Sequence, residues 1–141
     1  MNKPYFIIDF DSTFTKIEGL DLLVEIVLAD DPKKEQVLKQ IQDITNQGMD
    51  GTLDFRASLS KRLALLRPHR KDIEQLAKRL KGYISDSFLR NSDFILDHKK
   101  QVFVVSNGFK DFIVPVIEHY GLLPEQVYAN EFVYDSEGYV T

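Results

Sequence analysis

The chain contains no cysteine and no excess of basic residues, and each absence excludes a class of protein. Without cysteine it can form neither a disulfide nor a thiolate metal site. Its 18 Lys and Arg residues against 22 Asp and Glu residues give a net charge of -4, which argues against a nucleic-acid partner because phosphate binding requires a basic face. No apolar run approaches a membrane span, and the N-terminal MNKPY lacks a signal-peptide pattern, so we expect a cytoplasmic protein.

The residues that are present indicate one folded domain. Hydrophobic residues make up 43% of the 141 residues and charged residues 28%, a composition typical of a folded protein with a core. The sequence has no internal repeat, low-complexity tract or interdomain linker.

Two aspartates follow an apolar run near the N-terminus, in the stretch YFIIDFDSTFT. The run 5–8 is rich in aromatic and β-branched residues and predicts a strand buried on both faces. Asp9 and Asp11 come directly after it. Because open α/β sheets bind ligands at the carboxyl ends of their strands, we expect a functional site here.

Paired carboxylates beside a buried strand need a partner, because an ionised carboxylate is costly to desolvate alone. A divalent cation is the simplest partner, since hard cations prefer oxygen ligands. One carboxylate could then attack phosphorus as a nucleophile, while the other exchanges protons with the leaving oxygen and with water. The alternative interpretation is that Asp9 and Asp11 only cap a turn after the strand.

Residues 17–82 predict four helices with no strand between them. Apolar residues recur at helical spacing in four segments: 19–29, 32–47, 55–66 and 70–81. We expect Asp31 to cap the second helix and Gly48 to end it. A helical block inserted after the first strand is typical of a lid, and the alternative is a helical segment that only packs on the sheet.

A second strand, at 101–105, also ends in small polar residues. We expect one amphipathic helix at 86–98 before it and another at 110–120 after it. Between strand and second helix lies Ser106-Asn107-Gly108, where backbone N–H groups and a hydroxyl at a helix N-terminus could hold an anion. A plain strand-to-helix turn is the alternative.

The remaining residues complete an α/β pattern. Residues 127–134 predict a third extended segment, and a turn at 135–138 then leads into a returning strand. The fold class we predict is α/β, with a Rossmann-like parallel sheet, incomplete at the C-terminus, and an inserted helical cap. We assign residues 1–16 and 83–141 to the core and 17–82 to a four-helix cap.

These motifs together resemble the haloacid dehalogenase superfamily of phosphatases, and most closely the phosphoserine phosphatase family. Three segments carry the resemblance: DFDSTFTKIEGLDLL is similar to the first motif and the acidic residue after it, MDGTLDFRASLSKRLALLRP to the lid segment, and VVSNGF to the second motif. The resemblance implies a Mg²⁺-dependent phosphomonoesterase that acts through an aspartyl-phosphate. Phosphoserine would be its substrate and L-serine a product.

The resemblance also implies roles for individual residues. Asp9 would be the nucleophile and Asp11 the general acid and base. Asp9 by its carboxylate and Asp11 by its backbone carbonyl would ligate Mg²⁺. The phosphoryl oxygens would be held by the second turn, Ser106, Asn107 and Gly108.

Three residues would recognise the rest of the substrate. The resemblance places Glu18 against its ammonium group, Arg62 against its carboxylate and Met49 on the lid side of the pocket. An anion for the amine and a planar cation for the carboxylate suit an amino acid ester. Without the resemblance, Glu18 and Arg62 would be interpreted as surface residues on helices.

The sequence departs from the family pattern in two ways. It has Ser-Asn-Gly where the family usually has Ser-Gly-Gly, so Asn107 could alter how the backbone approaches the phosphate. The family's phosphate-neutralising lysine and downstream acidic motif correspond to positions beyond Thr141. We therefore expect weak Mg²⁺ binding and very slow turnover from a truncated chain, because phosphoryl transfer depends on electrostatic stabilisation. We also expect an exposed apolar edge beside the second strand, through which the chain forms a homodimer or aggregates unless its tail rearranges to cover that edge.

Two other functions remain open. The chain could be a catalytically dead domain that serves as a binding or assembly module. It could also be a phosphatase for a different small metabolite, because a fold does not determine a substrate.

Overall fold

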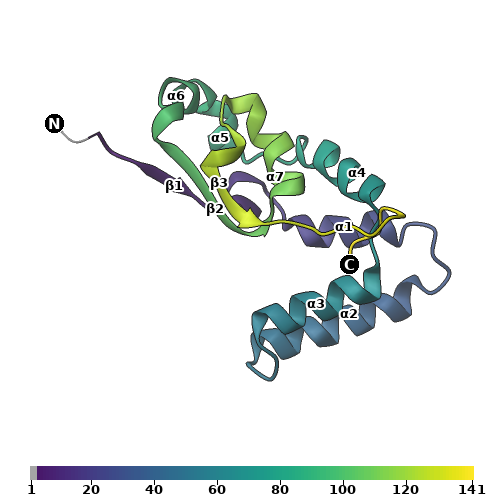
Figure 1. Ribbon diagram of the computed structural model, residues 1–141. Coiled ribbons are helices and arrows are strands. Elements are labelled where there is room, and N and C mark those ends of the chain that lie inside the picture. Colours follow the sequence, from purple (N-terminus) through teal and green to yellow (C-terminus); the bar gives the residue numbers. More distant parts are fainter. Residues whose placement is uncertain (1–2) are drawn as a thin grey trace.

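The computed structural model describes residues 3–141 and contains one three-stranded parallel sheet (Figure 1). The strands β1 (Phe6–Ile8), β2 (Val102–Phe109) and β3 (Val127–Asn130) lie in the order β1-β2-β3. This arrangement confirms the predicted Rossmann-like α/β class. The first two residues of the predicted core segment lie outside the described residues.

Seven α-helices accompany the strands in the described part of the chain. They are α1 (Gly19–Val27), α2 (Lys34–Met49), α3 (Phe55–Leu66), α4 (Arg70–Leu80), α5 (Asp86–Arg90), α6 (Ser92–Asp97) and α7 (Lys110–Ile117). The four helices predicted over 17–82 are therefore present. Helices α2 and α3 form a hairpin that projects from the rest of the molecule, while α4 packs against both α1 and α7 (Figure 1). The division into core and cap segments stays a prediction.

Two details of α2 differ from expectation. The cap position is Lys33, and the Asp31 carboxylate accepts a hydrogen bond from the Lys33 N–H at 2.8 Å in the turn before the helix. Gly48 does not end the helix, which continues to Met49. A Cβ atom at Gly48 would lie 2.7 Å from the Ser58 hydroxyl of α3. This glycine therefore serves the close approach of two helices rather than a helix end.

The single helix predicted over 86–98 is wrong, because two short helices, α5 and α6, occupy that range. The break lies at Asn91, whose side-chain amide donates to the Ser87 carbonyl at 2.7 Å. Asparagine side chains that bond the backbone in this way compete with helix continuation. Apolar periodicity did not reveal this competition.

Phenylalanine rings form the centre of the core. Phe10, Phe14 and Phe112 are fully buried, and the rings of Phe10 and Phe14 stack with centroids 5.9 Å apart. Each buried ring of this size contributes about 2–3 kcal/mol through removal from water. Both Phe10 and Phe14 lie in the tight turn that follows β1, so the core directly holds the segment that carries Asp11.

The first strand is not buried on both faces, contrary to expectation. Phe6 and Ile8 pack against the core, but Ile7 is 73% exposed and Tyr5 just before the strand is 69% exposed. The same outer face carries the exposed Val105 and Tyr128. The helices around the sheet cover the other face, so the described residues form a sheet covered on one side only (Figure 1).

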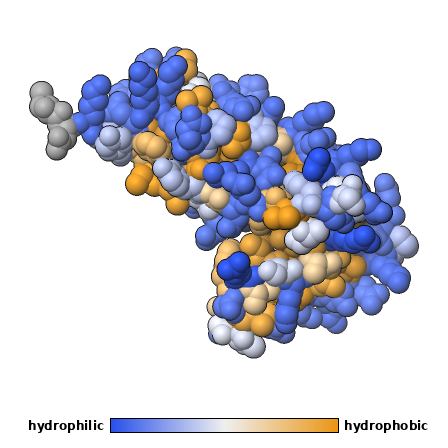
Figure 2. All heavy atoms as spheres, in the orientation of Figure 1, coloured by the Kyte–Doolittle hydropathy of each residue, from blue (hydrophilic) through white to orange (hydrophobic). Residues whose placement is uncertain are grey.

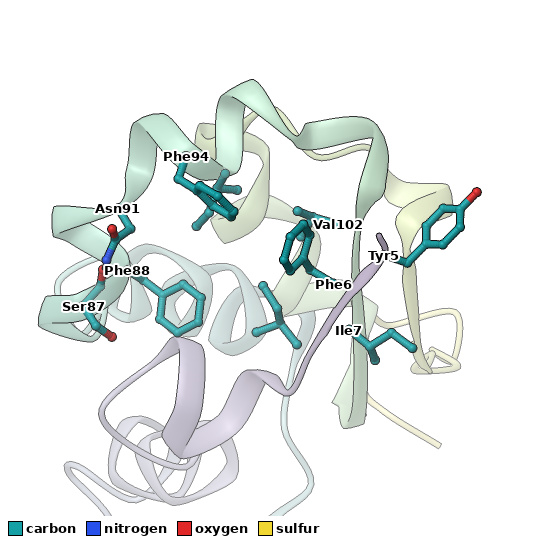
Figure 3. Close-up of a pocket in the computed structure, with 10 residues that line it drawn as sticks. Tyr5, Phe6, Ile7, Ser87, Phe88, Asn91, Phe94 and Val102 are labelled. Atoms are coloured by element: carbon teal, nitrogen blue, oxygen red, sulfur yellow. Dashed lines mark hydrogen bonds between the residues drawn. The ribbon is translucent and has the colours of Figure 1, made fainter. Parts of the chain in front are cut away.

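The free edges of the sheet lie beside the second strand. Strand β2 is central and pairs with β1 and β3, so the unpaired edges belong to the two strands beside the second strand. A groove of about 390 Å³ runs beside β1. Figure 3 shows the rings of Phe6, Phe88 and Phe94 gathered on one side of β1, with Tyr5 and Ile7 pointing to the other.

The C-terminal residues form the expected turn and then contact the linker between α3 and α4, which the sequence did not predict. Strand β3 ends at Asn130, earlier than predicted, and Tyr134 pairs with Val140 around the turn. The Val140 N–H then donates to the Pro68 carbonyl at 2.9 Å, and His69 Nε2 lies 2.9 Å from the Glu137 carbonyl oxygen. The tail therefore attaches to the linker between α3 and α4.

Candidate active site

The carboxyl ends of β1 and β2 lie next to each other. Ile8 pairs with Val104, so Asp9, which follows β1, and Ser106, two residues further along β2, lie at the same edge of the sheet. Asp9 is exposed, and its Oδ1 accepts a hydrogen bond from the Phe10 N–H at 2.8 Å. The chain then turns sharply, with Ser12 at a φ of 58°, and this turn directs the second aspartate back toward the protein.

Asp11 connects three elements that are far apart in the sequence. Its Oδ1 accepts from the Gly19 N–H at the start of α1 at 2.6 Å, and its Oδ2 accepts from the Ser106 hydroxyl at 3.4 Å. Burial raises the pKa of Asp11, the hydrogen bond from Gly19 opposes that rise, and the charges of Glu18 and Asp9 add to it. A carboxyl group with a raised pKa suits proton transfer to a leaving oxygen.

The second turn is shaped by Gly108. Its N–H donates to the Ser106 hydroxyl oxygen at 2.9 Å. A Cβ atom at Gly108 would lie 3.0 Å from Asp11 Oδ2 and 3.1 Å from the Ser106 hydroxyl. Only glycine leaves this approach open. Strand β2 runs through the turn to Phe109, with its pairing to β3 interrupted after Val105, so the predicted turn is an irregular strand end just before α7.

Asn107 is exposed at the same turn, and its contact is made by the backbone. Its carbonyl accepts a hydrogen bond from the Asn130 side-chain amide at 3.0 Å. Within residues 3–141, the side chain that departs from the family pattern takes no part in the hydrogen bonds that join Asp11, Ser106, Gly19 and Gly108.

Glu18 lies at the rim of the same edge. Its Oε1 accepts a hydrogen bond from the Ser12 hydroxyl at 2.7 Å, and it occupies the cap position before α1. Sequence reasoning did not single out Ser12 or Gly19, although the first follows Asp11 directly and the second follows Glu18. Their contacts depend on the tight turn, which no periodicity predicts.

Arg62 and Met49 are not brought together with these residues. Within residues 3–141, no hydrogen bond or ion pair links either of them to Asp9, Asp11 or Ser106. Met49 is 83% exposed at the end of α2. Arg62 is half-buried on α3, and its Nε donates to the Ser58 carbonyl at 3.4 Å. Figure 2 shows apolar surface gathered over the projecting hairpin that carries both residues.

The oxygen atoms at the strand ends could supply some of the ligands of a hard cation. No cluster of three or more His, Asp or Glu side chains that could hold a metal occurs within residues 3–141. Mg²⁺ usually keeps several waters and binds through one or two carboxylates together with substrate phosphate oxygens. The Asp9 carboxylate and the Asp11 carbonyl fit such a site, with the remaining positions left to water and phosphate.

Comparison with solved structures identifies the class of fold to which this chain belongs. No protein-family model matches this chain. A phosphoserine phosphohydrolase-like protein from Francisella tularensis superposes with a TM-score of 0.78 at 31% identity, over 99% of this chain and 63% of its own. A phospho-aspartyl intermediate analogue of phosphoserine phosphatase superposes with a TM-score of 0.71 at 25% identity, over 100% of this chain and 62% of its own. The chain has the fold of the haloacid dehalogenase phosphatases.

The particular relatives are phosphoserine phosphatases. The protein of Homo sapiens is 26% identical and that of Drosophila melanogaster 29% identical, each over 130 residues and 92% of this chain. The chain spans about half the length of these curated relatives, 54% and 45% respectively. The similarity to phosphoserine phosphatases that the motifs indicated is therefore confirmed. In addition, no helix within residues 3–141 has the length and apolar character needed to cross a membrane.

Proposed function

We propose that this chain carries the nucleophile and the proton donor of a cytoplasmic, Mg²⁺-dependent phosphomonoesterase. The hydrogen bond from Ser106 to Asp11 is the observation that carries the proposal, because it joins the two motifs at one edge of the sheet. The similarity to phosphatases over nearly the whole chain supports the same reaction class.

The residues divide the reaction between them. Asp9 attacks phosphorus, the bond from phosphorus to the ester oxygen breaks, and the leaving oxygen takes a proton from Asp11. Water then attacks phosphorus in the aspartyl-phosphate and gives its proton to Asp11, while the bond from phosphorus to the Asp9 oxygen breaks and releases inorganic phosphate and the free Asp9 carboxylate. Ser106 and the turn at Gly108 would hold the phosphoryl oxygens. Mg²⁺, held by the Asp9 carboxylate and the Asp11 carbonyl, would neutralise charge on the phosphate.

Phosphoserine is the substrate that we propose. Glu18 is within reach of the strand ends and would take the ammonium group, while Arg62 would take the carboxylate. Because Arg62 and Met49 lie apart from Asp9 in this structure, binding would require the α2–α3 hairpin to approach the strand ends. The similarity to phosphoserine phosphatases over 92% of this chain supports this class of ligand.

The chain by itself should turn over slowly. Within residues 3–141, no group of three or more His, Asp or Glu side chains could hold a metal, and phosphoryl transfer depends on charge neutralisation by metal and cation. The discriminating observation is the reading frame after Thr141. Continuation into a lysine and an acidic pair would support the enzyme, whereas a stop codon there would favour a binding module.

Kinetics on the protein from the complete reading frame test the assignment. Asp9→Asn should abolish phosphate release, and retained activity would remove Asp9 from the nucleophile role. Glu18→Ala and Arg62→Ala should weaken hydrolysis of phosphoserine far more than that of an aryl phosphate. An equal loss on both substrates would contradict the amino acid assignment while leaving the phosphatase reaction in place.

A module that assembles with a second copy of this chain is the second candidate function. The exposed outer face of the sheet and the unpaired edge of β1 favour it. Two β1 edges present identical backbone groups and could pair antiparallel about a two-fold axis. Light scattering at high concentration should then detect a dimer that Ile7→Lys abolishes and Leu123→Lys, an exposed control away from the strands, preserves. A monomer at high concentration would contradict this candidate.

A further inference from the structure

An acidic residue outside the predicted site, Asp21, shares a small cavity with Arg62. The cavity is about 30 Å³ and is lined by residues of α1, α2 and α3. The other lining residues are mostly aliphatic: Leu20, Val24, Ile41, Thr45, Leu59, Leu63 and Leu66. A guanidinium group in such a setting needs a counter-charge, because apolar walls do not replace its hydration.

The hydrogen bonds of Arg62 leave its terminal nitrogens available. Its Nε is committed to the Ser58 carbonyl of its own helix. Burial lowers the pKa of Arg62, and the charge of Asp21 opposes that change. Within residues 3–141 the ion pairs closer than 4.0 Å are Lys16–Asp86 and Lys110–Glu131. Asp21 therefore attracts the guanidinium group of Arg62 without forming an ion pair with it. A second carboxylate could therefore still bind in a bidentate way.

The first turn of α1 relates Asp21 to the site. Glu18 and Asp21 are three residues apart and so lie on neighbouring positions of one helix face. Gly19 between them is fixed to the Asp11 carboxylate by its N–H. The residue proposed for the substrate ammonium and the residue that faces Arg62 are therefore anchored together to the strand ends.

Two acidic residues and one basic residue act on the pKa of Asp21. Burial raises the pKa of Asp21, the charges of Glu18 and Glu25 add to that rise, and Arg62 opposes it. A carboxyl group among two other acids is stabilised in its charged form by the one nearby cation.

We propose that Asp21 is a positioning residue that holds the Arg62 guanidinium toward α1, where it can receive the carboxylate of a phosphorylated amino acid. This inference rests on the proposed function. Asp21 itself touches no substrate atom. The alternative is competition, in which the Asp21 carboxylate binds the Arg62 guanidinium and prevents it from binding the substrate carboxylate.

Binding of two ligands separates these behaviours. O-phosphoserine and O-phosphoethanolamine share phosphate and amine, but only the first has a carboxylate. By calorimetry, Asp21→Asn should weaken phosphoserine binding about three- to fivefold, the size of a partly exposed charge coupling, and leave phosphoethanolamine unchanged. Asp21→Glu should restore part of the affinity, and Asp30→Asn, an exposed change just after the same helix, should have no effect.

A double-mutant cycle then tests whether Asp21 acts through Arg62. In an Arg62→Met background, Asp21→Asn should cause no further loss. Equal weakening of both ligands, a loss that persists without Arg62, or tighter phosphoserine binding would overturn the proposal. The last result would indicate competition.

A titration without any ligand keeps this inference separate from the proposed function. Carbon NMR of the Asp21 carboxyl should report a higher pKa in Arg62→Met, because the opposing positive charge is gone. Arg56→Met, an exposed change on the same helix, should leave it unaltered. An unaltered titration in Arg62→Met would overturn the pairing. Failure of the unchanged chain to bind phosphoserine would instead overturn the proposed substrate.

Discussion

The Ser106 hydroxyl donates a hydrogen bond to the Asp11 carboxylate at 3.4 Å, although 95 residues separate them in the sequence. Parallel pairing of β1 with β2 makes this contact, because it places both strand ends at one edge. Asp11 also accepts from Gly19, so its carboxylate is held from two sides.

Replacement of Ser106 by Ala should raise the pKa of Asp11 further. The hydroxyl stabilises the ionised carboxylate, so its loss favours the protonated form. The cost to the free energy of unfolding should be about 0.5–1.5 kcal/mol, the usual contribution of one hydrogen bond. Carbon NMR titration and urea denaturation measure the two effects. Ser136→Ala, in an exposed turn, is the control, and an unchanged Asp11 titration in Ser106→Ala would contradict the contact.

Replacement of Gly108 by Ala should disturb the anion turn. The new methyl group would crowd Asp11 Oδ2 and the Ser106 hydroxyl, both within 3.1 Å. We expect a loss of about 1–3 kcal/mol in stability, typical of overpacking, and weaker binding of inorganic phosphate. Gly82→Ala, where the nearest atom is 3.4 Å away, should be tolerated. Normal phosphate binding in Gly108→Ala would show that this turn does not hold the anion.

Asp11→Asn should stabilise the folded chain at neutral pH. The pKa of Asp11 is raised above its ordinary value of 3.8, so the folded state binds its proton more tightly than the unfolded state. The charged carboxylate therefore costs stability above the raised pKa, and this cost disappears as the pH falls below 3.8. Urea denaturation of both proteins over a pH series measures the difference. A gain that grows toward acidic pH would have the wrong sign.

Phe14→Ala should unfold the segment that carries Asp11. Phe14 is fully buried and contacts Phe10, Phe88 and Tyr120. Loss of a buried aromatic ring costs about 3–5 kcal/mol. Phe55→Ala, at a position 51% exposed on the projecting hairpin, should cost far less. Equal losses in the two variants, measured by thermal denaturation, would contradict the described core.

The sequence alone determined the order of the elements and the chemistry of the strand ends. Apolar runs predicted β1, β2 and the four helices over 17–82, because burial imposes a period on each element. The acidic pair predicted where charge would gather, because carboxylates next to an apolar strand need a cation or a hydrogen bond.

Only the tertiary structure decided which residues meet. The contacts of Asp11 with Gly19 and Ser106 depend on a tight turn and on parallel pairing, which no local pattern contains. Periodicity predicted that β1 is buried on both faces, yet the helices cover one face and leave Ile7 exposed, because burial depends on what packs against a strand. The cavity that Asp21 and Arg62 share likewise forms only where α1, α2 and α3 come together, and the sequence separation of 41 positions hides it.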